Sequence, residues 1–164
     1  MNEVPKKSWA DTKINDDFIC IRTASGYRSA SPDYRGRQDF LPPNADDEVI
    51  GHTLIDALAQ SKFLDPMKNN DFFDSESVAQ RYAEWVRAVM ERYGYKTKRA
   101  MFKNMKSCRV ECHNNVIMVK PSNHVKLEAW GREKSDGIED VVISANSSPR
   151  EIGAALRLAF ERCT

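Results

Sequence analysis

The stretch SCRVECHNNVIMVKPSNHVKLEAWGREKSDGIEDVVIS, residues 107–144, decides the fold of this chain. Strict alternation of polar and apolar residues over 107–112 is typical of a β-strand with one buried face. Three further apolar runs follow, at residues 116–120, 125–130 and 141–144. Asn-Asn, Pro-Ser-Asn and Asp-Gly separate the runs, and these residues favour tight reversals of the chain. The stretch therefore predicts an antiparallel β-meander.

Three α-helices are predicted outside this stretch. The first begins near Asn44 and ends near Lys62, with apolar residues three and four positions apart. The second begins at residues 74–75 and ends at Gly94, because glycine suits the left-handed conformation after a helix. The third follows SPRE at residues 148–151, a capping box with proline at the first helical position. Strands segregated from helices indicate an α+β fold with an antiparallel sheet.

The remaining segments are expected to form two strands and a lead-in. Residues 17–23 are rich in β-branched side chains and predict a first strand. The basic residues 96–106 predict an extra edge strand, whose lysines would discourage pairing with another chain. Residues 1–15 lack periodicity and are expected to be loosely ordered. With 164 residues, the chain is expected to fold as a single domain, residues 1–164.

The composition is that of a soluble globular protein, with 41% hydrophobic and 30% charged residues. The apolar runs are too short to span a membrane, so no membrane partner is expected. Residues 1–7 lack the apolar core of a secretory signal, and a cytoplasmic location is therefore expected. The four cysteines are interpreted as free, buried thiols in a reducing compartment. They are Cys20, Cys108, Cys112 and Cys163.

Candidate catalytic and metal-binding motifs are weak. Cys108 and Cys112 would share one face of a strand, but about 13 Å apart at the usual strand rise. A zinc ion needs ligands within a few Å, so neither a metal nor a cofactor is expected. The sequence also lacks a glycine-rich phosphate loop, a G-x-S-x-G motif and an H-E-x-x-H motif. These observations favour a binding protein over an enzyme.

The net charge of +1 conceals two blocks of opposite sign. Residues 39–76 contain nine carboxylates against only two lysines. Residues 96–109 contain six basic side chains and no acid. Such blocks are usually solvated faces, but they also suit a charged partner. The basic block leaves open a nucleic-acid-binding module, and the acidic block a metal-dependent hydrolase.

Residues 24–43 have the composition of a long loop, with two glycines, three prolines and several serines. Long loops of this kind are commonly functional or disordered. Its tyrosines and arginines argue against disorder, because these residue types are enriched at protein interfaces. Two interpretations remain open at this stage: a loop packed over the sheet with arginines paired to nearby carboxylates, or a partner-binding loop.

Residues 18–29, 34–38 and 148–159 resemble the immunity proteins of bacterial contact-dependent growth inhibition (CDI) systems. The segments are FICIRTASGYRS, YRGRQ and SPREIGAALRLA. The resemblance implies a cytosolic, non-enzymatic protein that binds and blocks the toxic C-terminal domain of a cognate effector, commonly a nuclease. It also implies that in some members the toxin adds a β-hairpin to the sheet of the immunity protein. The family has no universal catalytic motif, so no catalytic residue is inferred.

The leading hypothesis is therefore an immunity protein that neutralises a nuclease toxin by occluding its active site or substrate groove. An acidic surface would complement the basic groove of a nuclease. The predicted toxin-binding residues come from the acidic block and the tyrosine- and arginine-containing loop. They are Asp46, Asp47, Glu48, Asp71, Asp74, Tyr27, Arg28, Tyr34, Arg35 and Arg37. Direct contact with nucleic acid is not expected in this interpretation; the alternative is nucleic-acid binding through residues 96–109.

Overall fold

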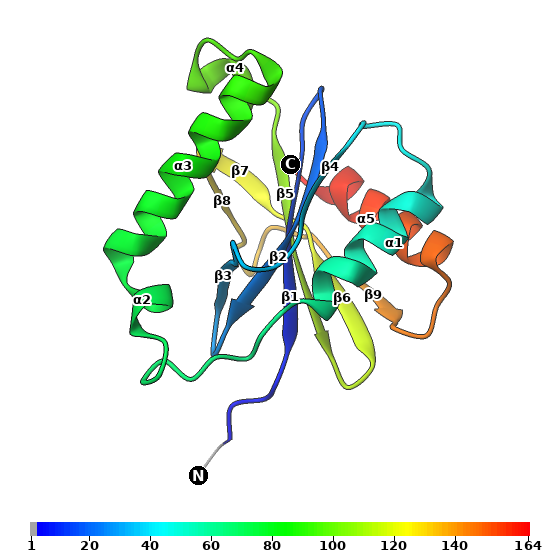
Figure 1. Cartoon of the computed structure of the whole chain (residues 1–164). Coiled ribbons are helices and arrows are strands. Elements are labelled where there is room, and N and C mark those ends of the chain that lie inside the picture. Colours follow the sequence, from blue (N-terminus) through cyan, green and yellow to red (C-terminus); the bar gives the residue numbers. More distant parts are fainter. Residues whose placement is uncertain (1–2) are drawn as a thin grey trace.

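The computed structural model describes residues 3–164 and contains an antiparallel sheet of seven strands (Figure 1). The order across the sheet is β3-β2-β1-β5-β6-β9, and β4 also pairs with β2. These strands are β1 (Ser8–Ile14), β2 (Ile19–Gly26), β3 (Ala30–Pro32), β4 (Gln38–Leu41), β5 (Lys106–His113), β6 (Val116–Lys120) and β9 (Val141–Ser144). A separate hairpin consists of β7 (Asn123–Lys126) and β8 (Ala129–Gly131). The predicted α+β class with an antiparallel sheet is confirmed.

Three long helices and two short ones accompany the sheet. They are α1 (Asp47–Ala59), α2 (Asn70–Phe73), α3 (Ser75–Tyr93), α4 (Lys98–Phe102) and α5 (Pro149–Arg162). The predicted caps of α3 and α5 are confirmed: Gly94 has a φ of 71°, and Ser148 and Glu151 make both hydrogen bonds of a capping box. No helix within residues 3–164 is long and apolar enough to cross a membrane.

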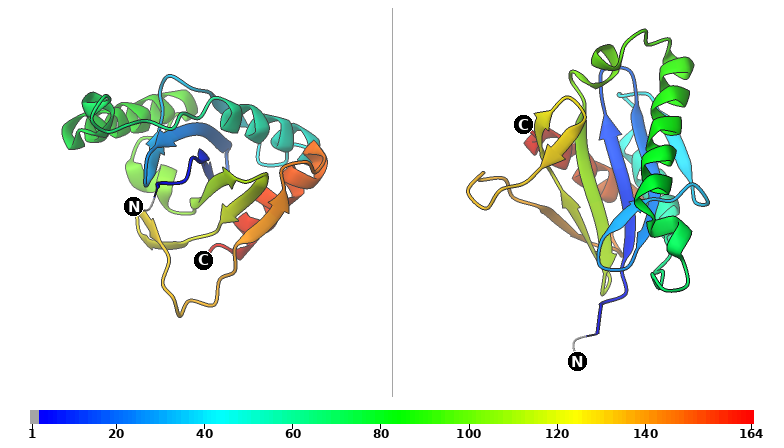
Figure 2. Two further views of the ribbon diagram at one scale, coloured as in Figure 1. Left: turned by 90° about the horizontal axis from the view of Figure 1, so that it is seen from below. Right: turned by 90° about the vertical axis from the view of Figure 1, so that its left-hand side faces the viewer.

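Helices cover both faces of the sheet. Helices α1 and α5 pack on one face, and α3 and α4 pack on the other (Figures 1 and 2). Successive side chains of β2 point to opposite faces of the sheet and so contribute to both hydrophobic cores. Ile19 and Ile21 pack in the core under α1 and α5, and Cys20 packs in the core under α3 and α4. Every residue of β2 is buried in consequence.

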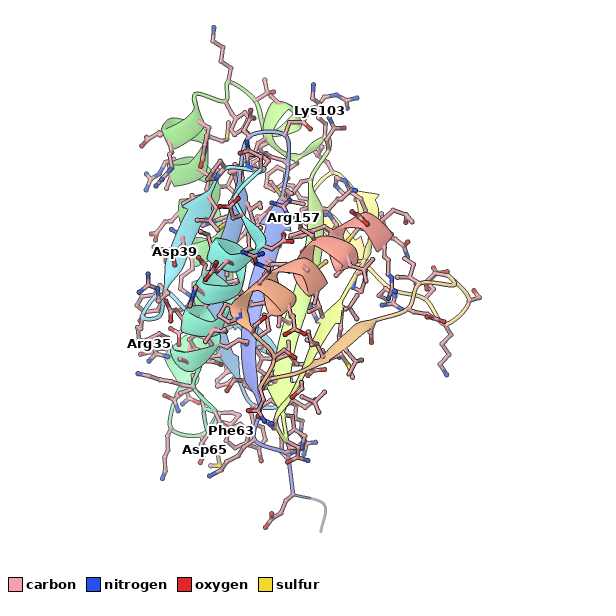
Figure 3. The ribbon with its side chains drawn as sticks, turned by 90° about the vertical axis from the view of Figure 1, so that its right-hand side faces the viewer. Arg35, Asp39, Phe63, Asp65, Lys103 and Arg157 are labelled. Carbon is pink, nitrogen blue, oxygen red and sulfur yellow. The ribbon has the colours of Figure 1, made fainter. Side chains whose placement is uncertain are left out.

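The contact between α1 and α5 depends on two glycines. A Cβ at Gly51 would lie 1.7 Å from the carbonyl oxygen of Pro149, and a Cβ at Gly153 would lie 1.8 Å from that of Asp47. The missing side chains therefore allow each helix to approach the N-terminus of the other. Figure 3 shows Arg157 between these two helices.

Two of the sequence predictions for the sheet are wrong. Residues 8–14 of the expected lead-in form β1, a central strand paired with β2 and β5; residues 1–2 lie outside the described residues. Residues 98–102 of the expected edge strand form helix α4, capped by Thr97, whose hydroxyl accepts from Ala100 N. In both segments, tertiary packing overrides a weak local signal.

The expected strand at 125–130 is also corrected. The chain reverses inside this run, and β7 and β8 pair with each other rather than with the sheet. The hairpin packs beside α4, where Trp130 contacts Phe102 and donates its indole N–H to the carbonyl of Met105 at 3.0 Å. The meander of the main sheet therefore consists of β5, β6 and β9.

Candidate protein-binding surface

An open groove of about 1120 Å³ lies between the N-terminal half of α3 and residues 31–38, which include β3. We call it the α3 groove. Trp85, Val86 and Val89 anchor α3 against the core. Residues Ser77–Tyr82 on the first turns of α3 line the groove, and most of them are half-buried or exposed. In Figure 1 this half of α3 stands away from the sheet, above α2.

A largely buried ionic network reaches the groove through Arg22. Arg22 and Trp85 both line the groove, and the guanidinium of Arg22 lies 4.1 Å from the centre of the Trp85 ring. Arg22 donates to the Asp11 carboxylate at 2.7 Å, and Lys13 donates to the same carboxylate at 3.0 Å. Lys13 also lies 4.9 Å from the centre of the Trp130 ring. The network connects β1 and β2 to the elements that cover this face of the sheet.

Both cations of the network determine the charge state of Asp11. Burial alone would raise its pKa, but the charges of Lys13 and Arg22 and their hydrogen bonds hold the pKa well below its ordinary value. Asp11 is therefore ionised at neutral pH and carries the one negative charge between the two cations. Removal of Asp11 would leave two cations without a counter-charge, which is strongly destabilising.

The turn at residues 33–36 forms one wall of the groove and is organised by Asp33. This carboxylate is 4% exposed and accepts from the Ser25 hydroxyl at 2.7 Å and from the Arg35 backbone N–H at 3.0 Å. Burial raises the pKa of Asp33, but the hydrogen bonds from Arg35 and Ser25 outweigh this effect and lower it. The turn holds Tyr34 with 72% of its surface exposed. A large aromatic side chain is thus displayed at the groove by a hydrogen-bonded turn.

Aromatic and arginine side chains connect the two walls. The Arg81 guanidinium of α3 lies 5.6 Å from the Tyr34 ring and 5.0 Å from the Phe72 ring. Arg35 lies 5.6 Å and 5.3 Å from the same two rings. Arg81 also donates to the carbonyl of Phe72 at 2.7 Å. These cation–π contacts fix the position of Tyr34 relative to α2 and α3.

Part of the predicted binding set meets at this groove. Tyr34, Arg37 and Asp71 line it, although they come from different segments. Arg35 contributes to the cation–π contacts described above. Asp74 is exposed and caps α3, since its carboxylate accepts from Ser77 N at 3.0 Å. Residues 65–76 contain four exposed carboxylates, of which Asp71 lines the groove.

The remaining predicted residues lie elsewhere. Asp47 accepts from Arg157 of α5 at 2.8 Å, and Glu48 pairs with Arg150 at 3.7 Å. These contacts, like exposed Asp46, belong to the N-terminus of α1. Tyr27 packs on Phe63 at a ring distance of 5.2 Å, with Arg28 over the Tyr27 ring. The acidic block is therefore divided between two regions of the surface.

The observed structure of residues 24–43 agrees in part with each of the two interpretations. Strands β3 and β4 pair with β2, and Arg35 and Arg37 form ion pairs with Asp33 and Asp39 at 3.0 and 3.2 Å. The segment thus packs over the sheet, as the first interpretation expects. It nevertheless exposes Tyr34 and Arg37 to solvent at the groove, which keeps the second interpretation open.

The groove residues that sequence reasoning missed include Arg22, Arg81 and Trp85. Arg22 interrupts an otherwise apolar strand, and a charged residue in such a strand could have indicated a buried ionic contact. Trp85 reads as an ordinary core residue of α3, and Arg81 as a surface charge. These three side chains are recognised as groove residues only because the fold brings them together.

The basic block does not form one continuous strand face. Lys98, Arg99 and Lys103 lie on or beside α4, whereas Arg109 lies in the middle of β5. Lys98 also pairs with Glu128 at 3.6 Å. Figure 3 shows Lys103 at the end of the molecule opposite Asp65. Among residues 3–164, no three His, Cys, Asp or Glu side chains converge as a metal site would require.

Comparison with known proteins identifies the family. The sequence model of the family described as "CdiI: CDI immunity protein" matches residues 8–163. This chain belongs to the CDI immunity protein family. The resemblance found in the sequence is thereby confirmed.

Individual proteins also match along the whole chain. Immunity protein CdiI-YPIII of Yersinia pseudotuberculosis serotype O:3 (strain YPIII) is 44% identical over 175 residues, covering 99% of each protein. A structure described as the CdiA-CT/CdiI toxin and immunity complex from Yersinia pseudotuberculosis superposes with a TM-score of 0.95 at 43% identity, covering 99% of this chain and 100% of the other. NMB0488 from Neisseria meningitidis, described as a protein of unknown function, has a TM-score of 0.90 at 42% identity, covering 100% and 99%.

Proposed function

We propose that this chain is a cytoplasmic, non-enzymatic immunity protein that binds the C-terminal toxin domain of its cognate effector and neutralises it. The observation that carries the proposal is the full-length similarity, at 43% identity, to the immunity component of a toxin and immunity complex. The toxin is proposed to be a nuclease, and binding to occlude its active site or substrate groove. The exposed carboxylates at residues 65–76 support this choice, because nucleases carry basic substrate surfaces.

The α3 groove is the proposed centre of the interface. Exposed Tyr34 supplies an aromatic anchor, and aromatic anchors commonly dominate binding energy. Asp71 and Arg37 place both signs of charge at the groove, which gives specificity for a complementary surface. An interface of ordinary size buries about 800 Å² on each partner, so toxin contacts must extend beyond the groove onto neighbouring elements.

The sheet edges offer a second mode of contact. Within the described residues, β3 and β9 end the sheet order, and each has one side without a paired strand. Strand β3 borders the groove through Ser31 and Pro32. A toxin strand added there would extend the sheet at the wall of the groove. This geometry favours the β3 edge over the more distant β9 edge.

Co-expression with the toxin domain encoded beside this chain tests the function. The expected results are growth rescue, a stable purified complex and loss of nucleic-acid degradation by the toxin at equimolar concentration. Failure to form a complex or to rescue growth would refute the immunity function. A complex that rescues growth while the isolated toxin degrades neither DNA nor RNA would refute only the nuclease assignment.

A matched pair of charge reversals tests the groove. Arg37→Glu changes a groove residue paired with Asp39, whereas Arg150→Glu changes an exposed residue of α5 paired with Glu48. We expect Arg37→Glu and Tyr34→Ala to weaken toxin binding by about tenfold or more in calorimetry. Arg150→Glu should stay within about twofold of the wild type, because rim and remote charges contribute little. Equal effects of the two reversals would place the interface outside the groove.

A further inference from the structure

Two of the four cysteines meet in the core. The Sγ atoms of Cys108, in β5, and Cys163, directly after α5, lie 3.5 Å apart. The two residues are 55 positions apart in the sequence. The sulfur–sulfur bond of a disulfide is about 2.05 Å long, so the two Sγ atoms must move closer to form one. The fold thus creates a dithiol pair that cysteine spacing alone does not reveal.

Both chain segments that carry the pair are held firmly. Cys108 is fully buried within β5, which pairs with β1 and β6. The residue after Cys163 is fixed on both sides, because Thr164 N donates to the Ser122 carbonyl at 3.1 Å and the Thr164 carbonyl accepts from His124 N at 2.8 Å. The Sγ of Cys163 also lies 3.4 Å from the carbonyl oxygen of Ala159. The contact is therefore a property of the packed core.

The two thiols differ in reactivity. The contact with Cys108 lowers the pKa of the Cys163 thiol despite burial. The same contact, together with burial, raises the pKa of Cys108. Cys163 is 7% exposed, whereas Cys108 is 0% exposed. Cys163 is thus the first sulfur that an oxidant would reach.

We propose that Cys108 and Cys163 form an intramolecular disulfide when the folded protein meets hydrogen peroxide. The Cys163 thiolate attacks one peroxide oxygen, the O–O bond breaks, and a sulfenic acid and hydroxide form. The Cys108 sulfur then attacks the sulfenic sulfur, and its proton leaves with the displaced hydroxide as water. Overall, two thiols and one peroxide give one disulfide and two waters, so the peroxide accepts the two electrons.

The bond would connect the end of α5 to a central strand. It closes a loop that contains β6, the β7–β8 hairpin, β9 and α5. Such a loop restricts the unfolded chain, which raises the unfolding temperature. The pair belongs to the α1–α5 side of the sheet, opposite Trp85 and the α3 groove. Oxidation should therefore stabilise the C-terminal third of the chain and leave the groove residues in place.

Peroxide treatment of the purified wild-type chain tests the proposal. Free thiols counted after denaturation should fall from four to two, in a monomer lighter by two hydrogen atoms. Peptic mapping at acidic pH should identify the Cys108–Cys163 peptide. The unfolding temperature should rise by about 5 °C or more, and a reductant should reverse the rise. Intermolecular dimers, a disulfide with another cysteine, or oxidation of Cys163 to sulfinic acid without a cross-link would each overturn the proposal.

Serine variants provide the matched control. Cys108→Ser and Cys163→Ser should both abolish the cross-link, whereas Cys112→Ser should retain it. Cys112 is the appropriate control because it lies on the same strand as Cys108 and packs against the same core cluster. The wild-type peptide map keeps the test decisive if Cys108→Ser does not fold. A cross-link that persists in Cys163→Ser would overturn the proposal.

Discussion

Replacing Gly153 by alanine is a strict test of the packing between α1 and α5. The new Cβ would lie 1.8 Å from the carbonyl oxygen of Asp47 and 2.6 Å from its carbonyl carbon. Carbon atoms normally pack at about 3.5–4.0 Å. The atoms in conflict belong to the backbone, so a rotamer change cannot relieve the overlap. Helix α1 must move away from α5.

Two effects of opposite sign compete in this variant. Alanine in place of glycine stabilises a helix interior by about 1 kcal/mol. Overpacking costs about 1–3 kcal/mol, and we expect the upper end because movement of α1 also disturbs Arg157. Arg157 donates to the Asp47 carboxylate at 2.8 Å, to the Pro43 carbonyl at 3.1 Å and to the Ala45 carbonyl. The expected net loss is about 2 kcal/mol, or about 4–8 °C in unfolding temperature for a chain of this size.

Urea and thermal unfolding, followed by circular dichroism, measure the effect. Ala154→Gly is the control, because Ala154 is exposed and is the next residue of the same helix. It should lose about 1 kcal/mol through helix propensity alone. A Gly153→Ala variant at least as stable as the wild type would refute the steric reasoning, since propensity would then outweigh packing.

Three further predictions concern stability and association. Because the pKa of Asp11 is depressed in the folded state, its contribution to stability is present above its unfolded pKa of about 3.9 and is lost as the pH falls further. The urea midpoint of Asp11→Asn should therefore be lower than that of the wild type at pH 6 and should fall less between pH 6 and pH 3. Equal decreases in the two proteins would contradict this. Ser148→Ala should remove the α5 cap and about 1 kcal/mol of stability by thermal melting, whereas exposed Ser135→Ala should change nothing. If the carboxylates at 65–76 steer a basic toxin, stopped-flow association should slow with added salt, and Asp71→Asn with Asp74→Asn should flatten that dependence; an unchanged salt slope in the double variant would refute steering.

The sequence by itself determined the elements whose signals are local. The capping box at Ser148 and the left-handed Gly94 require only neighbouring backbone groups, and both helix ends occur where they were predicted. The alternation at 107–112 likewise predicts β5, because the side-chain period of two is intrinsic to a strand. The resemblance in residues 18–29, 34–38 and 148–159 also indicated the family without any structure.

Tertiary structure decided the elements whose stability comes from distant partners. Strand β1 contains the charged residues Asp11 and Lys13, so its sequence does not show the pattern of a buried strand. In the fold, Asp11 pairs with Lys13 and Arg22, and these two cations lie over Trp130 and Trp85. The ion pair of Asp47 with Arg157 has a related origin, since Arg157 lies 110 positions away and no local pattern indicates the contact. The hydrophobic pattern of a sequence predicts which side chains are buried, but it does not predict which distant charges form ion pairs. The α3 groove and the Cys108–Cys163 pair exist only because the fold brings separate segments into contact.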